Sequence, residues 1–293
     1  MHRIHIVIAG ICYKVLQSIR RSRRIQTSGL AVFADDDLGL RIACLGEFEG
    51  DILNYIRHRF GSCMKDKTLL DVGANLGNHT NALCNQFAHC HAFEADPRTF
   101  RLLQANLADK ENITCHQMAV SELDGVMRFC QDRDNTGKSH VVEMQSDHFQ
   151  VDASVAHITV NSRRLDTVLD LSEKVGMVKI DVEGHELQVL RGARGILTAH
   201  KPTVIIELLA DSVINGRAPT LDYLAEIGYS KFEAVCVPST YIAAISHNPF
   251  LRWINHALHA IEIIVLGTRK ATASDLNIAA LKKQNYDAII VSQ

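Results

Sequence analysis

Short apolar runs alternate with amphipathic stretches along most of the chain, and this pattern predicts its secondary structure. Runs of apolar and β-branched residues predict strands at 68–72, 90–94, 113–120, 177–182, 203–208, 232–237 and 286–291. Apolar residues spaced three or four apart predict helices at 51–60, 78–86, 97–108, 165–171, 185–191 and 221–227. Strands that alternate with helices form a mostly parallel sheet covered on both faces. We therefore expect an α/β, doubly wound fold.

Three stretches interrupt this alternation. Residues 28–45 predict a β-hairpin with arms at 30–34 and 38–45, and short polar strands are expected at 126–130, 140–144 and 157–160. Before the last strand, a helical insertion is expected at about 239–285, with an apolar stripe along 250–265 and a second helix at 276–284. The stripe suits a helix packed on the domain, a lid over the substrate or a helix that faces a membrane.

Residues 1–27 form a basic amphipathic segment that precedes a domain of residues 28–293. The apolar stretch from Ile4 to Ile19 is interrupted by polar residues, and it is shorter than the roughly 20 apolar residues of a transmembrane helix. Most of its positive charge follows the apolar stretch, whereas a secretion signal carries its charge first. Two interpretations stay open: Ile4–Arg24 lies peripherally on an anionic membrane, or it packs on the domain with its basic end in solvent.

Composition narrows the class of protein. A formal net charge of −2 does not suit a general nucleic-acid-binding protein, which needs many contacts to phosphates. The 8 cysteines are scattered without a Cys-x-x-Cys pair, as is typical of free thiols in a reducing cytoplasm. Along a strand, Cys90 would face away from His89 and His91, so this cluster has poor spacing for zinc and no metal site is predicted.

The segment Asp71-Val-Gly-Ala-Asn-Leu-Gly77 links a predicted strand to a predicted helix through a glycine-rich turn. Such a turn brings backbone N–H groups close to a nucleotide-like ligand. It lacks the Gly-x-Gly-x-x-Gly pattern of dinucleotide sites, and no Gly-Lys-Ser/Thr of a P-loop follows. An acid that opens the turn, with Gly73 and Gly77 on either side of Asn75, suits a cationic nucleoside such as S-adenosylmethionine.

Carboxylates end four of the first five strands of the predicted alternating block. They follow the first, second, fourth and fifth strands, at Asp71, Glu94, Asp181 with Glu183, and Glu207. Ligands of doubly wound sheets bind at the carboxyl ends of the strands. An acid after the second strand can accept both hydroxyls of a ribose, and we assign this role to Glu94.

With these segments in order, the chain resembles the FkbM family of S-adenosylmethionine-dependent methyltransferases, a class I methyltransferase group. The resemblance rests on the turn at 70–77, on Ala92-Phe-Glu-Ala-Asp-Pro97 and, above all, on Lys179-Ile-Asp-Val-Glu-Gly-His-Glu186. It implies a seven-stranded sheet with an antiparallel last strand. It also implies transfer of a methyl group to a hydroxyl, often on a sugar or a polyketide-like acceptor.

The resemblance also implies roles for individual residues. The motif that holds the amino-acid end of the cofactor is matched by Asp71, Gly73, Asn75 and Gly77. The acid that binds the ribose of the cofactor is matched by Glu94. Val120 and Ser121 match the loop beside the adenine, whereas Asp181 and Glu183 match acids next to the methyl group and the acceptor. His79 and Thr80 lie where many relatives have an aromatic residue before a threonine, so His79 is a departure from the family pattern.

A neutral hydroxyl is a poor nucleophile, so methyl transfer needs a base within hydrogen-bonding reach. The candidates are Asp181, Glu183, His185 and Glu207, although His185 also suits a solvated position at a helix start. Asp181 with Glu183 could instead hold a divalent cation through oxygen ligands.

The sequence thus predicts a cytoplasmic S-adenosylmethionine-dependent O-methyltransferase, with peripheral membrane contact through its first residues. Its acceptor would be a hydroxyl of a small molecule, a glycan or a glycolipid precursor rather than a nucleic acid. The alternative is a non-catalytic, membrane-associated binding module on the same fold, since fold alone does not fix function.

Overall fold

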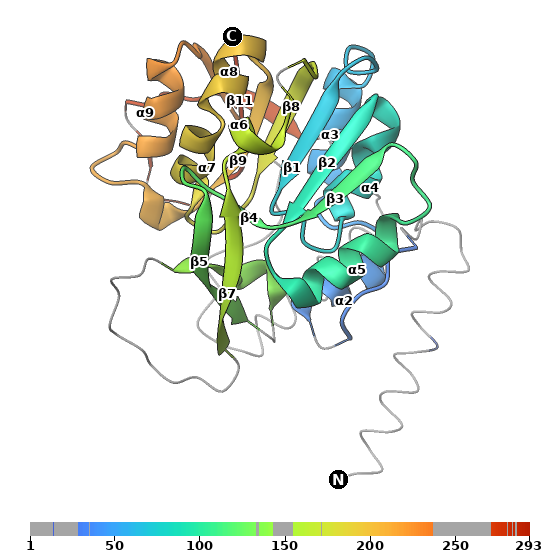
Figure 1. Ribbon diagram of the computed structural model, residues 1–293. Coiled ribbons are helices and arrows are strands. Elements are labelled where there is room, and N and C mark those ends of the chain that lie inside the picture. The colour runs from blue at the N-terminus through green and yellow to red at the C-terminus, as the bar shows by residue number, and fades with distance from the viewer. Residues whose placement is uncertain are drawn as a thin grey trace.

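A computed structural model describes Lys14 and residues 29–34, 36–132, 135–142, 155–170, 172–236, 271–279, 281–282, 284 and 286–293. Its main feature is a sheet of 8 strands in the order β11-β10-β12-β9-β8-β1-β2-β3 (Figure 1). The strands are β1 (Thr68–Val72), β2 (His89–Glu94), β3 (Ile113–Gln117), β8 (Val175–Ile180), β9 (Thr203–Leu208), β10 (Lys231–Cys236), β11 (Thr272–Asp275) and β12 (Tyr286–Ser292).

Seven of these strands are those that the sequence predicts. β12 runs antiparallel to both of its neighbours, β9 and β10, so the doubly wound sheet with an antiparallel last strand is confirmed. The additional strand, β11, pairs antiparallel with β10 at one edge. The predicted strand at 113–120 divides, because β3 stays in this sheet and β4 (Ala119–Val120) joins another.

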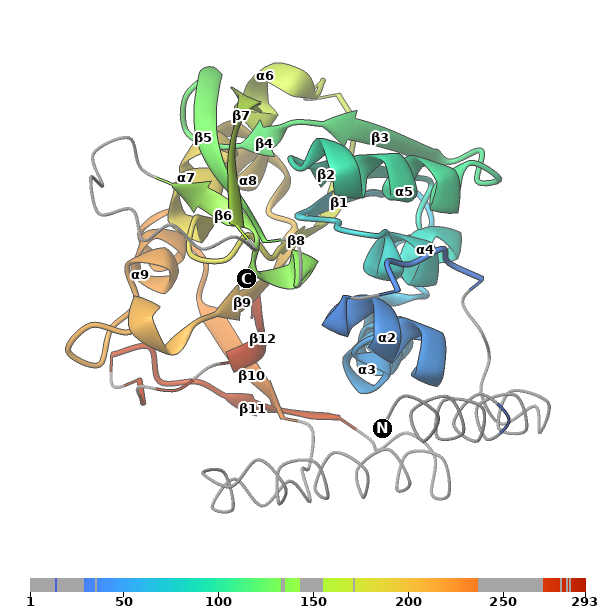
Figure 2. The ribbon, with the colours of Figure 1, turned by 90° about the horizontal axis from the view of Figure 1, so that it is seen from below.

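Helices cover both faces of the sheet (Figures 1 and 2). They are α2 (Asp37–Leu45), α3 (Gly50–Phe60), α4 (Asn78–Leu83), α5 (Pro97–Leu107), α6 (Leu165–Val168), α7 (Glu186–Gly192), α8 (Arg194–His200) and α9 (Pro219–Glu226), with short 3₁₀ turns η1 (Cys84–Gln86), η2 (Thr136–Lys138) and η3 (Ala210–Ser212). Alternation along the strands divides the core between the two faces. Leu70 of β1 packs with Leu190 of α7, whereas its neighbour Leu69 packs with Ile56 of α3.

A second sheet of 4 strands, in the order β4-β7-β5-β6, projects below the main sheet in Figure 1. It contains β4, β5 (Gly125–Asp132), β6 (His140–Val142) and β7 (Val155–Arg163). The three polar strands expected from the sequence are confirmed here, and two of them are longer than predicted. The turn η2, between β5 and β6, contacts the start of α2, because the Thr136 N–H donates to the Asp36 carboxylate at 2.7 Å.

The predicted hairpin at 28–45 is wrong. Residues 38–45 belong to helix α2, because the Asp36 carboxylate accepts the Gly39 N–H at 2.8 Å and caps the helix start. Residues 30–33 form no strand either, and the Ala31 N–H instead donates to the side chain of Asn106 at 2.7 Å. An acidic run that looks like a hairpin turn is here a helix cap.

The second helix predicted in the insertion, at 276–284, is also wrong for the residues that the structure describes there. Their backbone donors are used elsewhere: the Leu276 N–H bonds to Phe232 and the Leu281 N–H to Gly216. In a helix that begins at 276, the Leu281 N–H would instead bond to the carbonyl four residues earlier. The stripe at 250–265 and the segment 1–13 lie outside the described residues.

Candidate active site

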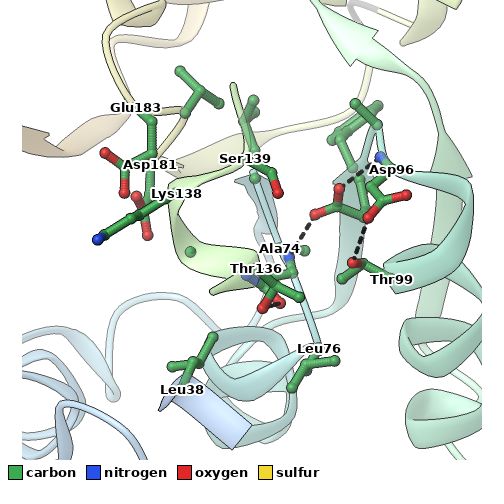
Figure 3. Close-up of a pocket in the computed structure, with 18 of the residues that line it drawn as sticks. Leu38, Ala74, Leu76, Asp96, Thr99, Thr136, Lys138, Ser139, Asp181 and Glu183 are labelled. Carbon is green, nitrogen blue, oxygen red and sulfur yellow. Dashed lines mark hydrogen bonds between the residues drawn. The ribbon is translucent and has the colours of Figure 1, made fainter. Parts of the chain in front are cut away.

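The described residues enclose a pocket of about 510 Å³ at the carboxyl ends of the central strands. Its floor comes from the turns after β1, β2 and β8, and from the end of β9. The η2 turn and residues of α2 line it as well (Figure 3). This is the edge at which doubly wound sheets bind ligands, and the volume suits a small-molecule site.

The glycine-rich turn approaches the end of β8 very closely. Gly73 has a φ of 78°, and a Cβ atom there would lie 1.8 Å from the carbonyl oxygen of Asp181. A glycine is therefore required at this position. Asn75 lies in the left-handed region as well, and its N–H points at the acid that ends β2.

Glu94 is that acid, and backbone groups hold it from both sides. Its two carboxylate oxygens accept the N–H groups of Asn75 at 2.9 Å and Asp96 at 2.8 Å. Burial raises the pKa of Glu94 to about 7. A carboxylate has about four acceptor sites, so Glu94 can still accept hydroxyls of a ligand beside these backbone bonds.

Asp96 braces the same wall of the pocket. Its carboxylate accepts the N–H of Arg98, at the start of α5, at 2.9 Å. It also accepts the hydroxyl of Thr99, again at 2.9 Å, as Figure 3 shows. The side-chain amide of Gln131, on β5, also donates to it. Asp96 thus joins the second sheet to the main sheet beside Glu94.

Most of the residues predicted for the site line this pocket, namely Gly73, Asn75, Glu94, Val120, Asp181, Glu183, His185 and Glu207. Asp71, Gly77 and Ser121 do not. Asp71 is fully buried behind the pocket wall, where it accepts the Thr80 hydroxyl at 2.5 Å. Gly77 has a φ of 87° at the start of α4, and Ser121 bonds to His185 at 2.9 Å.

Lys179 is a pocket residue to which the sequence analysis gave no role. Its ammonium lies 3.0 Å from an Asp181 oxygen and 3.6 Å from an Asp71 oxygen. Strand register explains the arrangement, because Asp71 of β1 pairs with Lys179 of β8. The signal was present, since a lysine two residues before an acid in a buried strand shares its face.

Asp181 and Glu207 share a hydrogen bond next to this lysine. Burial opposes ionisation of Asp181, but the charge of Lys179 outweighs it and lowers the pKa of that carboxyl. Burial, with the charge of Asp181, raises the pKa of Glu207 to about 9. At neutral pH, Asp181 is therefore the carboxylate of the pair and Glu207 the acid that donates to it.

Glu183 and His185 occupy the turn after β8. Glu183 has a φ of 52°, an uncommon conformation for a residue that is not glycine. Burial and the charges of Asp181 and Glu186 raise the pKa of Glu183 to about 7. His185 is buried rather than solvated, and this burial lowers the pKa of His185 to about 4, so its ring is neutral at pH 7.

Two possibilities raised by the sequence concern metals and membranes. Within the described parts of the chain, no group of three or more His, Cys, Asp and Glu side chains is arranged to hold a metal ion. Helices long and apolar enough to cross a bilayer are likewise absent from those parts.

A model of the methyltransferase FkbM domain matches residues 71–230, which are more than half of the 293 residues. The chain belongs to the FkbM methyltransferase family. The resemblance inferred from the motifs is thereby confirmed. The matched residues include Glu94 and the turn with Asp181 and Glu183, but they leave out helices α2 and α3.

One relative is the hexuronic acid methyltransferase AglP of Haloferax volcanii. The two sequences are 31% identical over 150 residues, which are 50% of this chain and 57% of AglP. The chain therefore spans little more than half the length of this relative.

Solved structures of similar shape include a methyltransferase FkbM from Methylobacillus flagellatus KT, at 19% identity and a TM-score of 0.43, over 76% of this chain and 54% of that one. A precorrin 8W decarboxylase from Methanobacterium thermoautotrophicum has 10% identity and a TM-score of 0.44, over 92% of this chain and 99% of its own. Structures this distantly similar give no information about the substrate of this chain.

Proposed function

We propose that this chain is an S-adenosylmethionine-dependent O-methyltransferase that acts on a hydroxyl of a glycan or glycolipid precursor. The observation that carries the proposal is Glu94, a buried acid after β2 held by two backbone N–H groups in a pocket of an FkbM-family chain. Such an acid suits the two hydroxyls of a ribose.

The residues present fit this cofactor. Acids line the pocket at both ends, which suits a positively charged sulfonium better than a polyphosphate. Glu94 would hold the ribose, Gly73 and Asn75 the amino-acid end, and Val120 the region of the adenine. Bound there, S-adenosylmethionine supplies an activated methyl group.

The acceptor assignment draws on the relative named for hexuronic acid, since 150 residues align with it. A sugar also suits the far end of the pocket, where the carboxyl groups of Asp181, Glu183 and Glu207 face the cavity. Carboxylates bind hydroxyl donors strongly. We therefore favour a sugar hydroxyl as the methylated group.

Glu183 is the best of the four candidate bases. A general base works best when its pKa lies near the working pH, and the pKa of Glu183 is raised to about 7. Asp181 is held ionised by Lys179 and has low proton affinity, whereas Glu207 already carries a proton at pH 7. His185 bonds to Ser121 and is a weak base because burial lowers its pKa to about 4.

In the proposed reaction, the acceptor oxygen forms a bond to the methyl carbon as the carbon–sulfur bond breaks. Glu183 takes the hydroxyl proton, and Asp181 with Glu207 orients the acceptor. Holding donor and acceptor in line can lower the barrier by about 7–11 kcal/mol. Contact of Ile4–Arg24 with a membrane stays a prediction, because almost all of that segment lies outside the described residues.

Transfer of a radiolabelled methyl group tests the proposal. The protein is incubated with S-adenosylmethionine and, separately, with methyl glycosides of hexoses and of hexuronic acids. We expect label in at least one glycoside, in an ether that survives mild base, with equimolar S-adenosylhomocysteine. Label found only in a base-labile ester would contradict transfer to a hydroxyl.

A further inference from the structure

Glu49, upstream of the residues that match the family, reaches into the pocket from an unusual backbone conformation. It precedes helix α3 with a φ of 56°, in the left-handed region. At the starts of α2 and α5, Asp36 and Asp96 accept backbone N–H groups, but the Glu49 carboxylate makes no such capping bond. A side chain held at a strained position without a capping role points to another use.

That side chain faces His79, on the first turn of α4. The Nε2 atom of His79 lies 3.1 Å from one Glu49 oxygen, and both residues line the pocket. The loop that carries Glu49 is fixed by Asn78, whose side chain accepts the Phe48 N–H at 3.0 Å and donates to the Phe48 carbonyl at 2.9 Å. The pair is thus held in place by its neighbours.

The contact between them uses one oxygen of Glu49 and one nitrogen of His79. Neither the Glu49 carboxylate nor the His79 ring forms a hydrogen bond within the described part of the chain, so both keep polar atoms for a ligand. Carboxylate oxygens accept hydrogen bonds from hydroxyls, and imidazole nitrogens also form hydrogen bonds with them. The pair therefore presents a carboxylate and an imidazole to the pocket, and both groups suit the hydroxyls of a ligand.

The pair lies next to the reacting end of the pocket. The charge of the Glu49 carboxylate contributes to the raised pKa of Glu207, so these two side chains lie close together. A small cavity of about 20 Å³ is lined by Glu49, His79, Asp181 and Glu207 together. A group bound to the pair would therefore be near a hydroxyl that faces Asp181 and Glu183.

We propose that Glu49 and His79 form an acceptor subsite that holds two neighbouring hydroxyls of a sugar, beside the hydroxyl that is methylated. This inference rests on the proposed function and names the part of the acceptor that the enzyme recognises. It also places acceptor selection partly upstream of residues 71–230, on the loop before α3.

The test compares Glu49→Gln and His79→Asn with Glu47→Gln. Glu47 is on the same loop but bonds to Arg57 at 2.6 Å and does not line the pocket. KM values are measured for a methyl glycoside and its monodeoxy analogues, and S-adenosylmethionine affinity is measured separately by calorimetry. Glycoside binding to the protein saturated with S-adenosylhomocysteine is measured as well.

We expect Glu49→Gln and His79→Asn to raise the KM for the glycoside by about tenfold or more, as for loss of a charged hydrogen bond. Cofactor affinity should stay within about twofold, and Glu47→Gln should behave as wild type. In the wild-type protein, the analogue that lacks one of the two hydroxyls should have a higher KM than the full glycoside. This difference in KM should be smaller in the two variants.

Equal KM values for Glu49→Gln and Glu47→Gln would overturn the inference, and so would a parallel loss of cofactor and glycoside affinity. Wild-type protein that binds S-adenosylmethionine but none of the glycosides would overturn it while cofactor binding stands. Folded protein that does not bind S-adenosylmethionine would overturn the proposed function, and this inference with it.

Discussion

The two ends of the pocket hold their acids in different ways. At one end, backbone N–H groups of Asn75 and Asp96 fix Glu94. At the other end, side chains do so: Lys179 lies 3.0 Å from Asp181, which shares a hydrogen bond with Glu207. Backbone donors survive most substitutions, whereas a lysine between acids can be lost by one mutation.

This difference predicts a rigid end that binds the cofactor and an end of interacting side chains that performs proton transfer. The predictions below separate the two ends, in order of expected effect.

Glu183→Gln should have the largest effect, on turnover. Loss of a general base typically lowers kcat by 10²–10⁴-fold. Because the base must be ionised, wild-type kcat/KM should rise with pH through about 7, the raised pKa of Glu183. Steady-state kinetics from pH 5.5 to 9, with calorimetric cofactor binding as the control, measure both. A variant with full turnover and the same pH profile would remove Glu183 from the mechanism.

Lys179→Met should have the largest effect on stability. It leaves the buried Asp71 and the partly buried Asp181 without their counter-charge, which should lower the free energy of unfolding by about 3–5 kcal/mol. Lys174→Met is the matched control, because Lys174 is exposed and pairs loosely with Asp66 at 3.7 Å. Urea denaturation compares the variants. A cost below about 1 kcal/mol for Lys179→Met would show that the acid pair does not depend on it.

Glu207 should make the free protein less stable as pH rises from 7 to 9. Its folded pKa of about 9 lies above the unfolded value, so the folded state holds a proton that the unfolded state has lost, and that stability disappears as pH approaches 9. We expect a loss of about 1–2 kcal/mol over this range. Urea denaturation at pH 7, 8 and 9 measures it, and Glu207→Gln should flatten the trend. If the free energy of unfolding fell equally with pH in the wild type and in Glu207→Gln, the loss of stability would belong to other groups.

Thr99→Val should have the smallest effect, because it tests the rigid end. The variant removes one of the donors to Asp96 but keeps the Arg98 N–H and the Gln131 amide. A hydrogen bond to a charged group contributes about 1.5–3 kcal/mol, and we expect the low end here because two donors to Asp96 remain. Cofactor affinity should stay within about twofold. Thermal unfolding and calorimetry measure the two quantities. Loss of cofactor binding would show that this wall is less robust than its backbone bonds suggest.

The same contrast explains what the sequence could predict. Strands and their terminal acids follow from apolar periodicity and topology, so Glu94, Asp181 and Glu207 were found. Contacts between those acids depend on register, which sets Lys179 beside Asp71 and is not visible in one sequence. A buried lysine next to an acid of the same strand face was the available signal.

The part of the pocket that α2 and η2 line was harder to predict. The acidic run at 35–37 resembles a turn in the sequence. Only the tertiary contact between Asp36 and the Thr136 N–H, at 2.7 Å, shows that this helix cap also binds η2. Side-chain contacts between distant segments, rather than local periodicity, complete the pocket.

Helix α8 was missed for a different reason. It follows α7 after a single residue, and the apolar pattern at 194–200 was too short to mark a separate helix.

Calorimetric titration with S-adenosylmethionine tests the central claim most directly, with NAD as the control ligand. Glu94→Ala is compared with Glu122→Ala, since Glu122 is a surface residue paired with Arg191 at 3.3 Å. The account predicts micromolar binding of S-adenosylmethionine, no binding of NAD, and at least a tenfold loss of affinity in Glu94→Ala alone. Folded wild-type protein that does not bind S-adenosylmethionine, or binds it equally well without Glu94, would contradict it.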